Sequence, residues 1–578
     1  MIKLLSKSIR QFKKQSLLAP LFVTLEVVME VIIPVLIADL MDKGIDGGSM
    51  SSIWYYGVLL AVSAILSLIF GGCSGHFAAV ASAGFARNLR HDMYYKVQEY
   101  SFSNIDKFST ASIVTRLTTD VTNVQNAYQM LVRIGVRSPV MMICSLIMAF
   151  LLQPTLALVF LVGIILVGFV LFYIATHVHP IFEKVFRIYD KLNSVVQENL
   201  RGIRVVKSYV REDHEVEKFD KVSQDIYRNF TRAEKMVAFN APTMQLAVYV
   251  CMICISWFAA NFIVAGDMTT GELTTMISYA MQILMNLMML SMVFVMVTMA
   301  KSSTERIVEL MLEEPDIHDP ENPVHEIKDG SISFRNVSFS YAKDPNKLAL
   351  RDVNLEIASG QTIGIIGGTG AAKSSLVQLI PRLYDVTTGQ LLVGGKDVRA
   401  YGLEDLRNEV AMVLQKNELF SGTIKENLRW GNEHATDEEI IRACQLAQAD
   451  EFIQRFPKKY DTYIEHGRTN VSGGQKQRLC IARALLKKPK ILILDDSTSA
   501  VDTKTDALIR QAFLEEIPDT TKIIIAQRVS SVQDADQIVV MDGGKINAVG
   551  THEELLKSNQ IYREVYESQQ KGGSEHEN

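Results

Sequence analysis

The sequence has few cysteines and no excess of basic charge, and both shortages disfavour classes of protein. Its six cysteines form no disulfide framework. Cys251 and Cys254 make a C-x-x-C pair, but they lie in an apolar run, where packed thiols are commoner than a redox or metal pair. The formal net charge of −5 is mild and gives no argument for nucleic acid as a partner. We therefore expect neither a disulfide-stabilised secreted domain nor a nucleic-acid partner.

Charged residues are also scarce before about residue 310, where long apolar segments dominate. A helix needs about 20 apolar residues to cross a bilayer. Six segments are near or above that length: Leu17–Leu40, Trp54–Val80, Val136–Leu152, Thr155–Ile174, Met244–Val264 and Leu273–Met299. They predict an all-α membrane domain of six transmembrane helices over residues 1–315.

Lysine and arginine are nearly absent from the short connections "DKGIDGGSMSS" and "QP", but frequent at the N-terminus and in the two long connections. Basic residues favour the cytoplasmic side of a membrane. We therefore predict a multi-pass protein of the cell membrane, in contact with lipid, whose N-terminus, long connections and back half are cytoplasmic. The polar breaks "SNIDKFSTAS" and "LRGIRVVKSYVRED" are predicted as turns that touch another domain.

Two carboxylates interrupt the first apolar segment. Glu26 and Glu30 are four residues apart and so share one helix face. A charge at mid-membrane costs on the order of 2.5–3.5 kcal/mol in insertion assays, so such residues face a cavity or a partner. Either they form a polar patch in a transport pathway that favours cations, or neighbouring helices cap them as structure. The sequence does not choose between these two interpretations.

The last apolar segment is rich in methionine and includes Met288 and Met292. Flexible thioethers suit surfaces that accept varied apolar ligands, although ordinary helix packing explains the same residues. Met288 and Met292 therefore join Glu26 and Glu30 as candidates for a pathway that takes a small amphipathic substrate.

From about residue 331 the hydrophobic period changes from helical to alternating, as in "SISFRNVSFSY". The following "GQTIGIIGGTGAAKSSLVQLI" indicates a strand, a glycine-rich loop and a helix, which together surround phosphates with backbone N–H groups. Lys373 would reach the β- and γ-phosphates of a nucleotide, and Ser374 would ligate Mg²⁺. The predicted phosphate loop comprises Gly367, Gly368, Thr369, Gly370, Ala371, Ala372, Lys373, Ser374 and Ser375.

The second glycine of the motif G-x-x-x-x-G-K-[ST] is absent, because Ala372 occupies that position. Its methyl group could crowd the loop or the phosphate. The lysine, the serine and the acids further along the chain still predict an α/β P-loop nucleotide-binding domain. We place this domain at 331–568, after a linker at 316–330 and before a disordered polar tail at 569–578.

The stretch "NVSGGQKQRLCIARALLKKPKILILDD" resembles the signature and Walker B region of ATP-binding cassette (ABC) proteins. With six membrane segments in front, nearly the whole chain resembles one half of an ABC exporter. The resemblance implies ATP and Mg²⁺ as cofactors and a second half-exporter subunit as partner. In that family two cassettes pack head to tail, and each ATP lies between one chain's phosphate loop and the other chain's signature.

The resemblance also implies roles for single residues. Tyr341 would stack on adenine, Gln415 would sense the metal and pass movement to the membrane helices, and Asp495 would bind the magnesium shell. The signature would be Ser472, Gly473, Gly474 and Gln475, preceded by Val471 where leucine is usual. The D-loop would be Ser499, Ala500, Val501 and Asp502.

Two positions of the hydrolytic machinery depart from the family pattern: Asp496 replaces the catalytic glutamate and Gln527 the switch histidine. General-base catalysis needs the base within about 2.6–3.2 Å of the water and contributes roughly 10²–10⁴-fold. The shorter stem withdraws the carboxylate by about 1 Å, a misplacement that can cost on the order of 10²-fold. Glutamine is neutral where histidine can carry charge. Together with Ala372, these departures predict a site that binds ATP and hydrolyses it slowly.

The signature keeps its S-G-G-Q core, which serves the opposite site. The chain thus resembles the degenerate-site subunit of heterodimeric multidrug ABC exporters, which move hydrophobic or amphipathic compounds at the expense of ATP hydrolysed mainly at the partner's site. A lipid or peptide exporter half, a homodimeric exporter with slow ATPase, a regulatory half that only holds ATP, and an importer on the same fold stay open as alternatives. The sequence does not specify the substrate.

Overall fold

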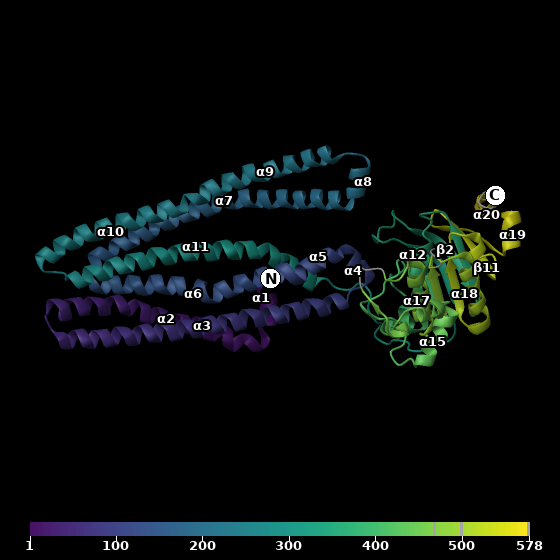
Figure 1. The fold of residues 1–578 in the computed structure, drawn as a ribbon, viewed down its shortest axis with the longest axis horizontal. Coiled ribbons are helices and arrows are strands. Elements are labelled where there is room, and N and C mark those ends of the chain that lie inside the picture. The colour runs from purple at the N-terminus through teal and green to yellow at the C-terminus, as the bar shows by residue number, and fades with distance from the viewer. Residues whose placement is uncertain (466–469, 498–500, 575–578) are drawn as a thin grey trace. The chain divides into compact units, whose positions relative to one another are not determined.

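The computed structural model describes residues 1–465, 470–497 and 501–574, and the chain divides into two compact units (Figure 1). The first unit comprises Met1–Glu99 and Ser109–Glu313. The second comprises Tyr100–Phe108 and the chain from Glu314 onward. A short piece of the front half therefore belongs to the same unit as the back half.

The first unit contains six helical segments that are long and apolar enough to cross a membrane, as predicted. In lipid a helix satisfies its own backbone groups, so long apolar runs fold in this way. Helix α2 packs along α3, and α6 packs along α11. The main helices are α2 (Lys13–Asp39), α3 (Met50–Gln98), α6 (Val121–Leu152), α7 (Pro154–Arg201), α10 (Asn240–Ala265) and α11 (Thr270–Leu312).

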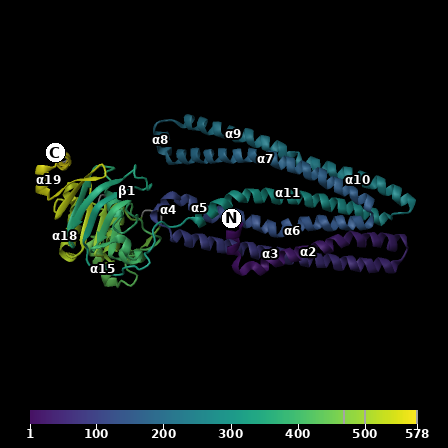
Figure 2. The ribbon, with the colours of Figure 1, turned by 180° about the vertical axis from the view of Figure 1, so that it is seen from behind.

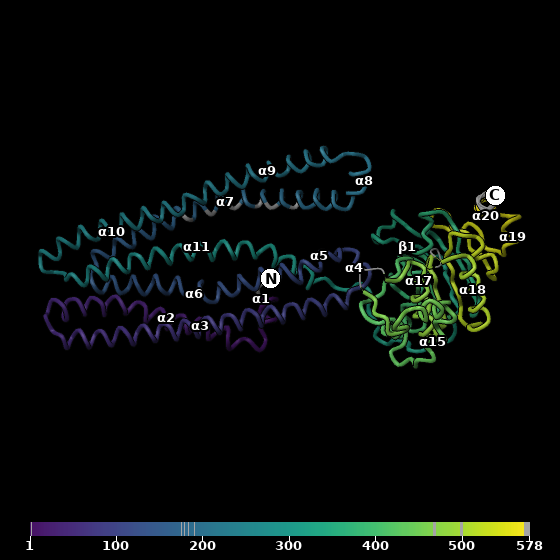
Figure 3. The backbone as a smooth tube through the Cα atoms, in the orientation of Figure 1, coloured from purple at the N-terminus to yellow at the C-terminus, as the bar shows by residue number. Residues whose placement is uncertain are grey.

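The long connections of this unit are helical as well. Helix α9 (Glu212–Ala238) lies along α7, and the short α8 (Ile203–Ser208) joins the two (Figure 3). Within the polar break predicted there, α8 is followed by exposed Tyr209 and Val210, and Val210 has a φ of 52°. The remaining elements are α1 (Ile2–Leu5), η1 (Ser6–Phe12), η2 (Leu40–Asp46), α5 (Thr110–Thr115) and η3 (Arg116–Asp120).

The second unit is an α/β domain, as predicted, in which helices pack beside strands (Figure 2). Its central sheet has the order β12-β11-β3-β10-β9-β6 and is parallel except for β12. A second sheet has the antiparallel order β2-β1-β4-β5. The strands are β1 (Ile332–Phe339), β2 (Leu350–Ile357), β3 (Thr362–Gly367), β4 (Thr388–Val393), β5 (Lys396–Asp397), β6 (Val410–Val413), β7 (Gly422–Thr423), β8 (Tyr463–Ile464), β9 (Ile491–Asp495), β10 (Thr521–Ile525), β11 (Gln537–Asp542) and β12 (Lys545–Gly550).

The parallel strands explain why distant motifs meet. Residues that follow β3, β6, β9 and β10 all leave the carboxyl edge of one sheet, where open α/β sheets bind ligands. The helices of this unit are α4 (Phe102–Lys107), α12 (Lys373–Gln378), η4 (Val398–Ala400), α13 (Leu403–Glu409), α14 (Ile424–Arg429), α15 (Asp437–Leu446), α16 (Asp450–Gln454), η5 (Lys459–Asp461), α17 (Gly473–Leu485), α18 (Thr503–Glu516), η6 (Val529–Ser531), α19 (His552–Ser558) and α20 (Gln560–Ser574).

Besides placing Tyr100–Phe108 in the second unit and not in the predicted membrane domain, the structure differs from the predicted boundaries in two places. The segment 316–330, expected as a linker, packs on the cassette: Ile327 is 1% exposed, and the Val324 N–H donates to the Ala400 carbonyl at 2.9 Å. Helix α20 continues to Ser574, into the tail expected to be disordered from residue 569, while residues 575–578 lie outside the described residues. Its apolar residues recur on one face, including Tyr562 and Tyr566, and this face covers the core.

Helix α4 belongs to the cassette unit, and its contacts show why. The Tyr384 hydroxyl donates to Asp106 Oδ2 at 2.6 Å, and the Phe102 ring lies at an angle to the Tyr384 ring. The hydroxyls of Ser101 and Ser103 both donate to Asp316. The break "SNIDKFSTAS" was predicted as a turn that touches another domain; the contact is present, but much of the break is the helix α4.

Candidate nucleotide-binding site

The phosphate loop connects β3 to α12 at the carboxyl edge of the central sheet. Gly367 closes the strand so tightly that a Cβ there would lie 2.2 Å from the Met541 carbonyl oxygen. At Gly368 and Gly370 an added Cβ would meet nothing within 4 Å. Gly370 has a φ of 85°, a conformation that favours glycine. The loop thus presents bare backbone to open space, as binding a phosphate requires.

Ala372 precedes the first residue of α12 with φ 65° and ψ 26°, in the left-handed region. That conformation costs an L-residue roughly 1–2 kcal/mol. The sequence predicted that the alanine methyl group could crowd the loop or the phosphate. The structure identifies backbone strain as a further consequence of the missing glycine.

Lys373 and Ser374 stand at the start of α12, where the N-terminal N–H groups point toward the loop. Lys373 Nζ donates to the carbonyl oxygens of Gly367 at 2.7 Å and Gly368 at 2.9 Å. Burial lowers the pKa of Lys373, and the charges of Asp495 and Asp496 act in the opposite direction. Ser374 Oγ donates to Asp495 Oδ1 at 3.0 Å. The predicted phosphate and metal ligands are therefore brought together.

Asp495 is the last residue of β9 and is 3% exposed. Burial raises its pKa, although the hydrogen bond from Ser374 opposes that rise. A buried carboxyl group next to a hydroxyl group fits a hard cation, because such ions prefer oxygen ligands and supply positive charge. The observed donor set therefore suits Mg²⁺.

The side-chain amides of Gln415 and Gln527 both approach the carboxylate of Asp496. Gln527 Nε2 donates to Asp496 Oδ2 at 2.7 Å, and Gln415 Nε2 approaches the same oxygen at 3.5 Å. The Asp496 backbone has a φ of 49°, and its N–H donates to the Ile525 carbonyl at 3.0 Å. The Gln527 amide thus donates a hydrogen bond to Asp496 Oδ2, a carboxylate oxygen at the position where a water-activating base is expected.

Tyr341 lies beyond β1 with about half of its surface exposed. Its hydroxyl lies 2.9 Å from Ser375 Oγ and donates to Gln378 Oε1 at 3.3 Å, so α12 anchors one end of the ring. The ring also contacts Tyr384 edge-on, with centroids 5.1 Å apart. A fixed, exposed aromatic ring beside the phosphate loop can serve as a stacking surface.

The signature residues begin α17. Ser472 Oγ accepts from the Gln475 N–H at 3.3 Å, and the Ser472 N–H donates to Gln475 Oε1 at 2.8 Å, which forms a capping box. Ser472 and Gly473 are exposed, whereas Gly474 and Gln475 are partly buried. In the described part of the chain, no hydrogen bond joins these four residues to the phosphate loop.

The predicted D-loop is only partly visible, because Ser499 and Ala500 lie outside the described residues. Val501 is buried. Asp502 caps α18 by accepting a hydrogen bond from the Thr505 N–H at 3.0 Å. This hydrogen bond is the main cause that lowers the pKa of Asp502.

The two carboxylates of the membrane unit share a partner that the sequence did not identify. Arg137, on α6, donates to Glu30 at 2.7 and 2.8 Å, and its Nε lies 3.5 Å from Glu26 Oε1. A Cβ at Gly71 of α3 would lie 3.1 Å from the Glu26 carboxyl carbon, so the glycine leaves room for that side chain. A neighbouring helix thus caps both carboxylates. The available signal was Arg137 itself, a basic residue inside the third apolar segment and four residues after Arg133.

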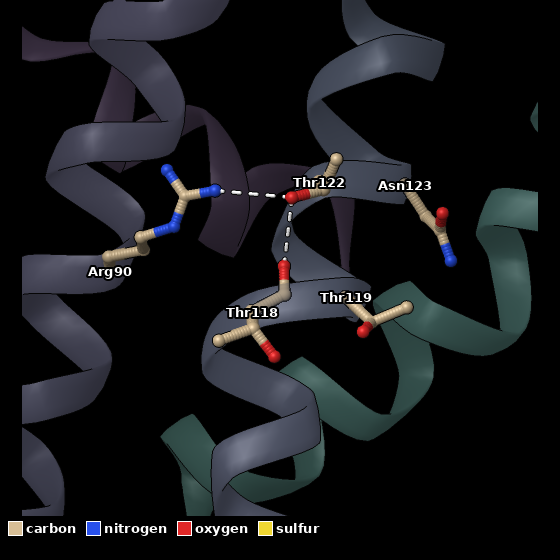
Figure 4. A pocket seen from close by; sticks show the side chains of 5 residues that line it. All are labelled: Arg90, Thr118, Thr119, Thr122 and Asn123. Atoms are coloured by element: carbon tan, nitrogen blue, oxygen red, sulfur yellow. Dashed lines mark hydrogen bonds between the residues drawn. The ribbon is translucent and has the colours of Figure 1, made fainter.

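The other membrane candidates are less enclosed. Met288 and Met292 are about half exposed. A shallow cavity of about 370 Å³ in the same unit is lined by Arg90, Thr118, Thr119, Thr122 and Asn123 (Figure 4). Arg90 Nη2 donates to Thr122 Oγ1 at 3.3 Å, and that hydroxyl donates to the Thr118 carbonyl. Three of these residues bond one another, and the two threonines of η3 and the two lining residues of α6 are exposed. We therefore interpret the cavity as a solvated polar surface.

Comparison with known proteins agrees with this geometry. The profile of the ABC transporter transmembrane region matches residues 16–288, and the profile of the ABC transporter family matches residues 350–499. The ABC transporter ATP-binding protein YfiB of Bacillus subtilis is 36% identical over 568 residues, 98% of each chain. ABC transporter B family member 4 of Dictyostelium discoideum is 32% identical over 492 residues, 85% of this chain and 64% of that protein.

Among solved structures, a bacterial Atm1-family ABC exporter with ATP bound matches with a TM-score of 0.84 and 24% identity, over 96% of this chain and 99% of that one. This likeness shows a shared fold. The chain therefore belongs to the ABC transporter family: it joins a transmembrane domain to an ATP-binding cassette, has the fold of an ABC exporter and couples ATP hydrolysis to transport.

Proposed function

We propose that this chain is the weakly hydrolysing half of a heterodimeric ABC exporter of hydrophobic or amphipathic compounds, of the multidrug type. The observation that carries the proposal is the contact between Gln527 Nε2 and Asp496 Oδ2 at 2.7 Å. A short carboxylate at the position of the general base is held by a neutral amide at the position of the switch histidine. Both substitutions act on the same reacting water.

The chain's own site binds ATP through the groups that the structure brings together. Tyr341 stacks on adenine, the phosphate loop surrounds the phosphates, and Lys373 exchanges its loop carbonyls for phosphate oxygens. Ser374, Asp495 and Gln415 would hold Mg²⁺, which neutralises phosphate charge when it is bound. The direct bond between Ser374 and Asp495 supports this assignment, because both oxygens already face one point.

Slow hydrolysis follows from reach and from charge. A base must lie within about 2.6–3.2 Å of the water, and Asp496 ends one methylene short of a glutamate. Gln527 accepts no proton and carries no charge near the γ-phosphate. We expect these two deficits to leave ATP bound and largely intact at this site.

The signature supports catalysis at the other site. Ser472 and Gly473 are exposed at the start of α17, and the capping box fixes their backbone without help from the phosphate loop of the same chain. In a head-to-tail pair they would contact the partner's ATP.

The membrane unit supports an amphipathic substrate. Met288 and Met292 offer exposed, adaptable apolar surface. Glu26 and Glu30 add a polar patch, and Arg137 offsets part of its negative charge. A pathway with groups of both signs favours amphipathic compounds and weakens the preference for cations that the two carboxylates alone would give.

Restoring the missing groups tests the proposal. We expect the Asp496→Glu, Gln527→His double variant of the full chain to hydrolyse ATP on the order of tenfold or more faster than the natural chain. The matched control is Asp496→Asn with Gln527→His, which restores the switch but removes the base. Vigorous ATPase activity of the unmodified chain by itself would contradict the proposal, and so would equal rates for the control and the double variant.

A further inference from the structure

A single side chain from the C-terminal helix α20 binds the backbone of the switch segment at two points. Gln569 Nε2 donates to the Gln527 carbonyl at 2.8 Å, and Gln569 Oε1 accepts from the Val529 N–H at 2.9 Å. One amide thus bridges residues i and i+2, as a neighbouring β-strand would. One bond goes to a backbone carbonyl and the other comes from a backbone N–H, so the side chain must both donate and accept, as the glutamine amide does.

Helix α20 is firmly attached to the cassette, so the bridge has a fixed base. Tyr562 is 0% exposed, and its hydroxyl bonds with His552 Nδ1 at 2.7 Å. Its N–H donates to Asn559 Oδ1 at 2.9 Å, which fixes the start of the helix. Val565 and Tyr566 pack against the buried core. Gln569 lies at the next turn of the helix, beyond this apolar face.

The bridge completes the support of the switch backbone. On one side, the Ala526 N–H donates to the Ile365 carbonyl of β3 at 3.3 Å. On the other side, Gln569 holds the next residues. Between these supports the Gln527 side chain projects to Asp496. With both sides fixed, the direction of the residue at position 527 is set by the backbone and not by its own side-chain rotamer alone.

We propose that Gln569 is a positioning residue for ATP hydrolysis, which holds the switch segment so that residue 527 faces the reacting water. Among the described residues its side chain bonds to the backbone of Gln527 and Val529, and it acts through this backbone. The proposal rests on the assignment of position 527 to the hydrolytic site. It makes the C-terminal helix α20 part of the catalytic support, although the sequence there is a polar tail.

The first experiment measures the bridge itself, in the full-length chain without nucleotide. We expect Gln569→Ala to accelerate amide hydrogen exchange at Val529 by about 3- to 10-fold, because the acceptor of that N–H is lost. The matched control is Gln570→Ala, which removes the adjacent exposed amide, bonded to the Tyr566 hydroxyl, and leaves the bridge intact. Gln569→Glu keeps the acceptor for Val529 and loses the donor to Gln527, so protection at Val529 should largely remain. Equal exchange in the natural chain and Gln569→Ala would overturn the proposal.

The second experiment measures positioning. Placed in the Asp496→Glu, Gln527→His chain, Gln569→Ala should lower the ATPase kcat by about 3- to 10-fold, with unchanged ATP affinity and unchanged Tm. Gln569→Glu should show a similar loss of kcat, because the bond to residue 527 is the one it removes, and Gln570→Ala should show none. Faster exchange at Val529 with kcat unaltered would overturn the positioning role. If the Asp496→Glu, Gln527→His variant gains no activity, the proposed function has failed. The positioning role is then tested in the otherwise natural chain, where Gln569→Ala should lower kcat by the same factor and an unaltered kcat would overturn it.

Discussion

Ala372 adopts a backbone conformation that glycine takes without strain, and this makes it the simplest residue to test. Replacement by glycine removes a left-handed penalty of about 1–2 kcal/mol, while the freer unfolded chain takes back about 0.4–1 kcal/mol. We expect Ala372→Gly to stabilise the cassette by up to about 1 kcal/mol and to tighten ATP binding, because the loop starts closer to its bound form. Thermal unfolding and ATP titration of the full chain measure both effects.

The neighbouring alanine supplies the control. Ala371 is 4% exposed and is not among the residues with positive φ. Ala371→Gly therefore relieves no strain: it increases the freedom of the unfolded chain and removes a buried methyl group, so it should destabilise the cassette by about 1–2 kcal/mol. Opposite signs at two adjacent positions would establish that the conformation matters. A loss of stability in both variants would show that Ala372 is not strained.

At the scale of elements, the attachment of α4 to the cassette centres on Asp316. The hydroxyls of Ser101 and Ser103 donate to this carboxylate, and Lys343 Nζ lies 2.8 Å from it. Burial acts to raise the pKa of Asp316, but these partners together outweigh burial and hold it at about 2. The ionised form is therefore the one that binds α4.

The sign of the pH dependence follows from that lowered pKa. The unfolded state takes up protons first, so the contribution of Asp316 is present above about pH 4 and is lost as the pH falls toward about 2. We expect no change in α4 attachment from Asp316 between pH 5 and 8. Asp316→Asn should weaken it by about 1 kcal/mol, discounted for solvent screening, as measured by hydrogen exchange of residues 102–107.

Lys343 distinguishes the hydroxyl bonds from the ion pair. Its side chain is 71% exposed, so Lys343→Met should change exchange in α4 much less than Asp316→Asn does. Equal effects would mean that the ion pair, and not the two serines, holds α4. If local opening of residues 102–107, measured by hydrogen exchange, increased as the pH fell from 8 to 5 in the natural chain, the assigned ionisation of Asp316 would be contradicted.

Elements with local signals could be predicted from the sequence, and contacts between elements could not. Six apolar runs, a glycine loop after a strand, and carboxylates at a strand end are each local patterns, and each is found where it was expected. The meeting of Asp495 with Ser374 was implied by the resemblance to ABC proteins, and the observed strand order β3-β10-β9 produces it. By contrast, the pairing of Arg137 with Glu30 depends on the register of α6 against α2, which no local pattern contains.

The same limit applies to Gln569 and Ala372. Gln569 lies in a run of polar residues whose composition indicated disorder, and its function depends on where α20 meets the switch segment. The missing glycine at position 372 was visible, but the sign of its backbone φ was not. Amino-acid composition indicates whether a segment is exposed to solvent, whereas the Gln569 bridge and the positive φ of Ala372 depend on backbone geometry.

At the scale of the whole molecule, the proposed function gives the chain two half-sites of unequal quality. In that proposal the phosphate loop and Walker B acids bind the chain's own ATP, with Ala372, Asp496 and Gln527 departing from the family pattern. The proposed signature, Ser472 to Gln475, keeps the S-G-G-Q sequence and is capped at the start of α17. If the chain pairs with a competent partner, damage to these two half-sites must have opposite consequences for total ATPase.

Two single substitutions in the assembled transporter test this asymmetry. Ser472→Asn keeps a residue that caps helices as well as serine does, so α17 should stay folded, while its larger amide displaces the contact to the partner's phosphate. We expect at least about a tenfold loss of ATPase, by analogy with the loss of one transition-state donor. Asp496→Asn damages only the slow site and should leave total ATPase within about twofold. Equal losses from both substitutions would indicate two equivalent sites, as in a homodimer, because every site would then need both Ser472 and Asp496.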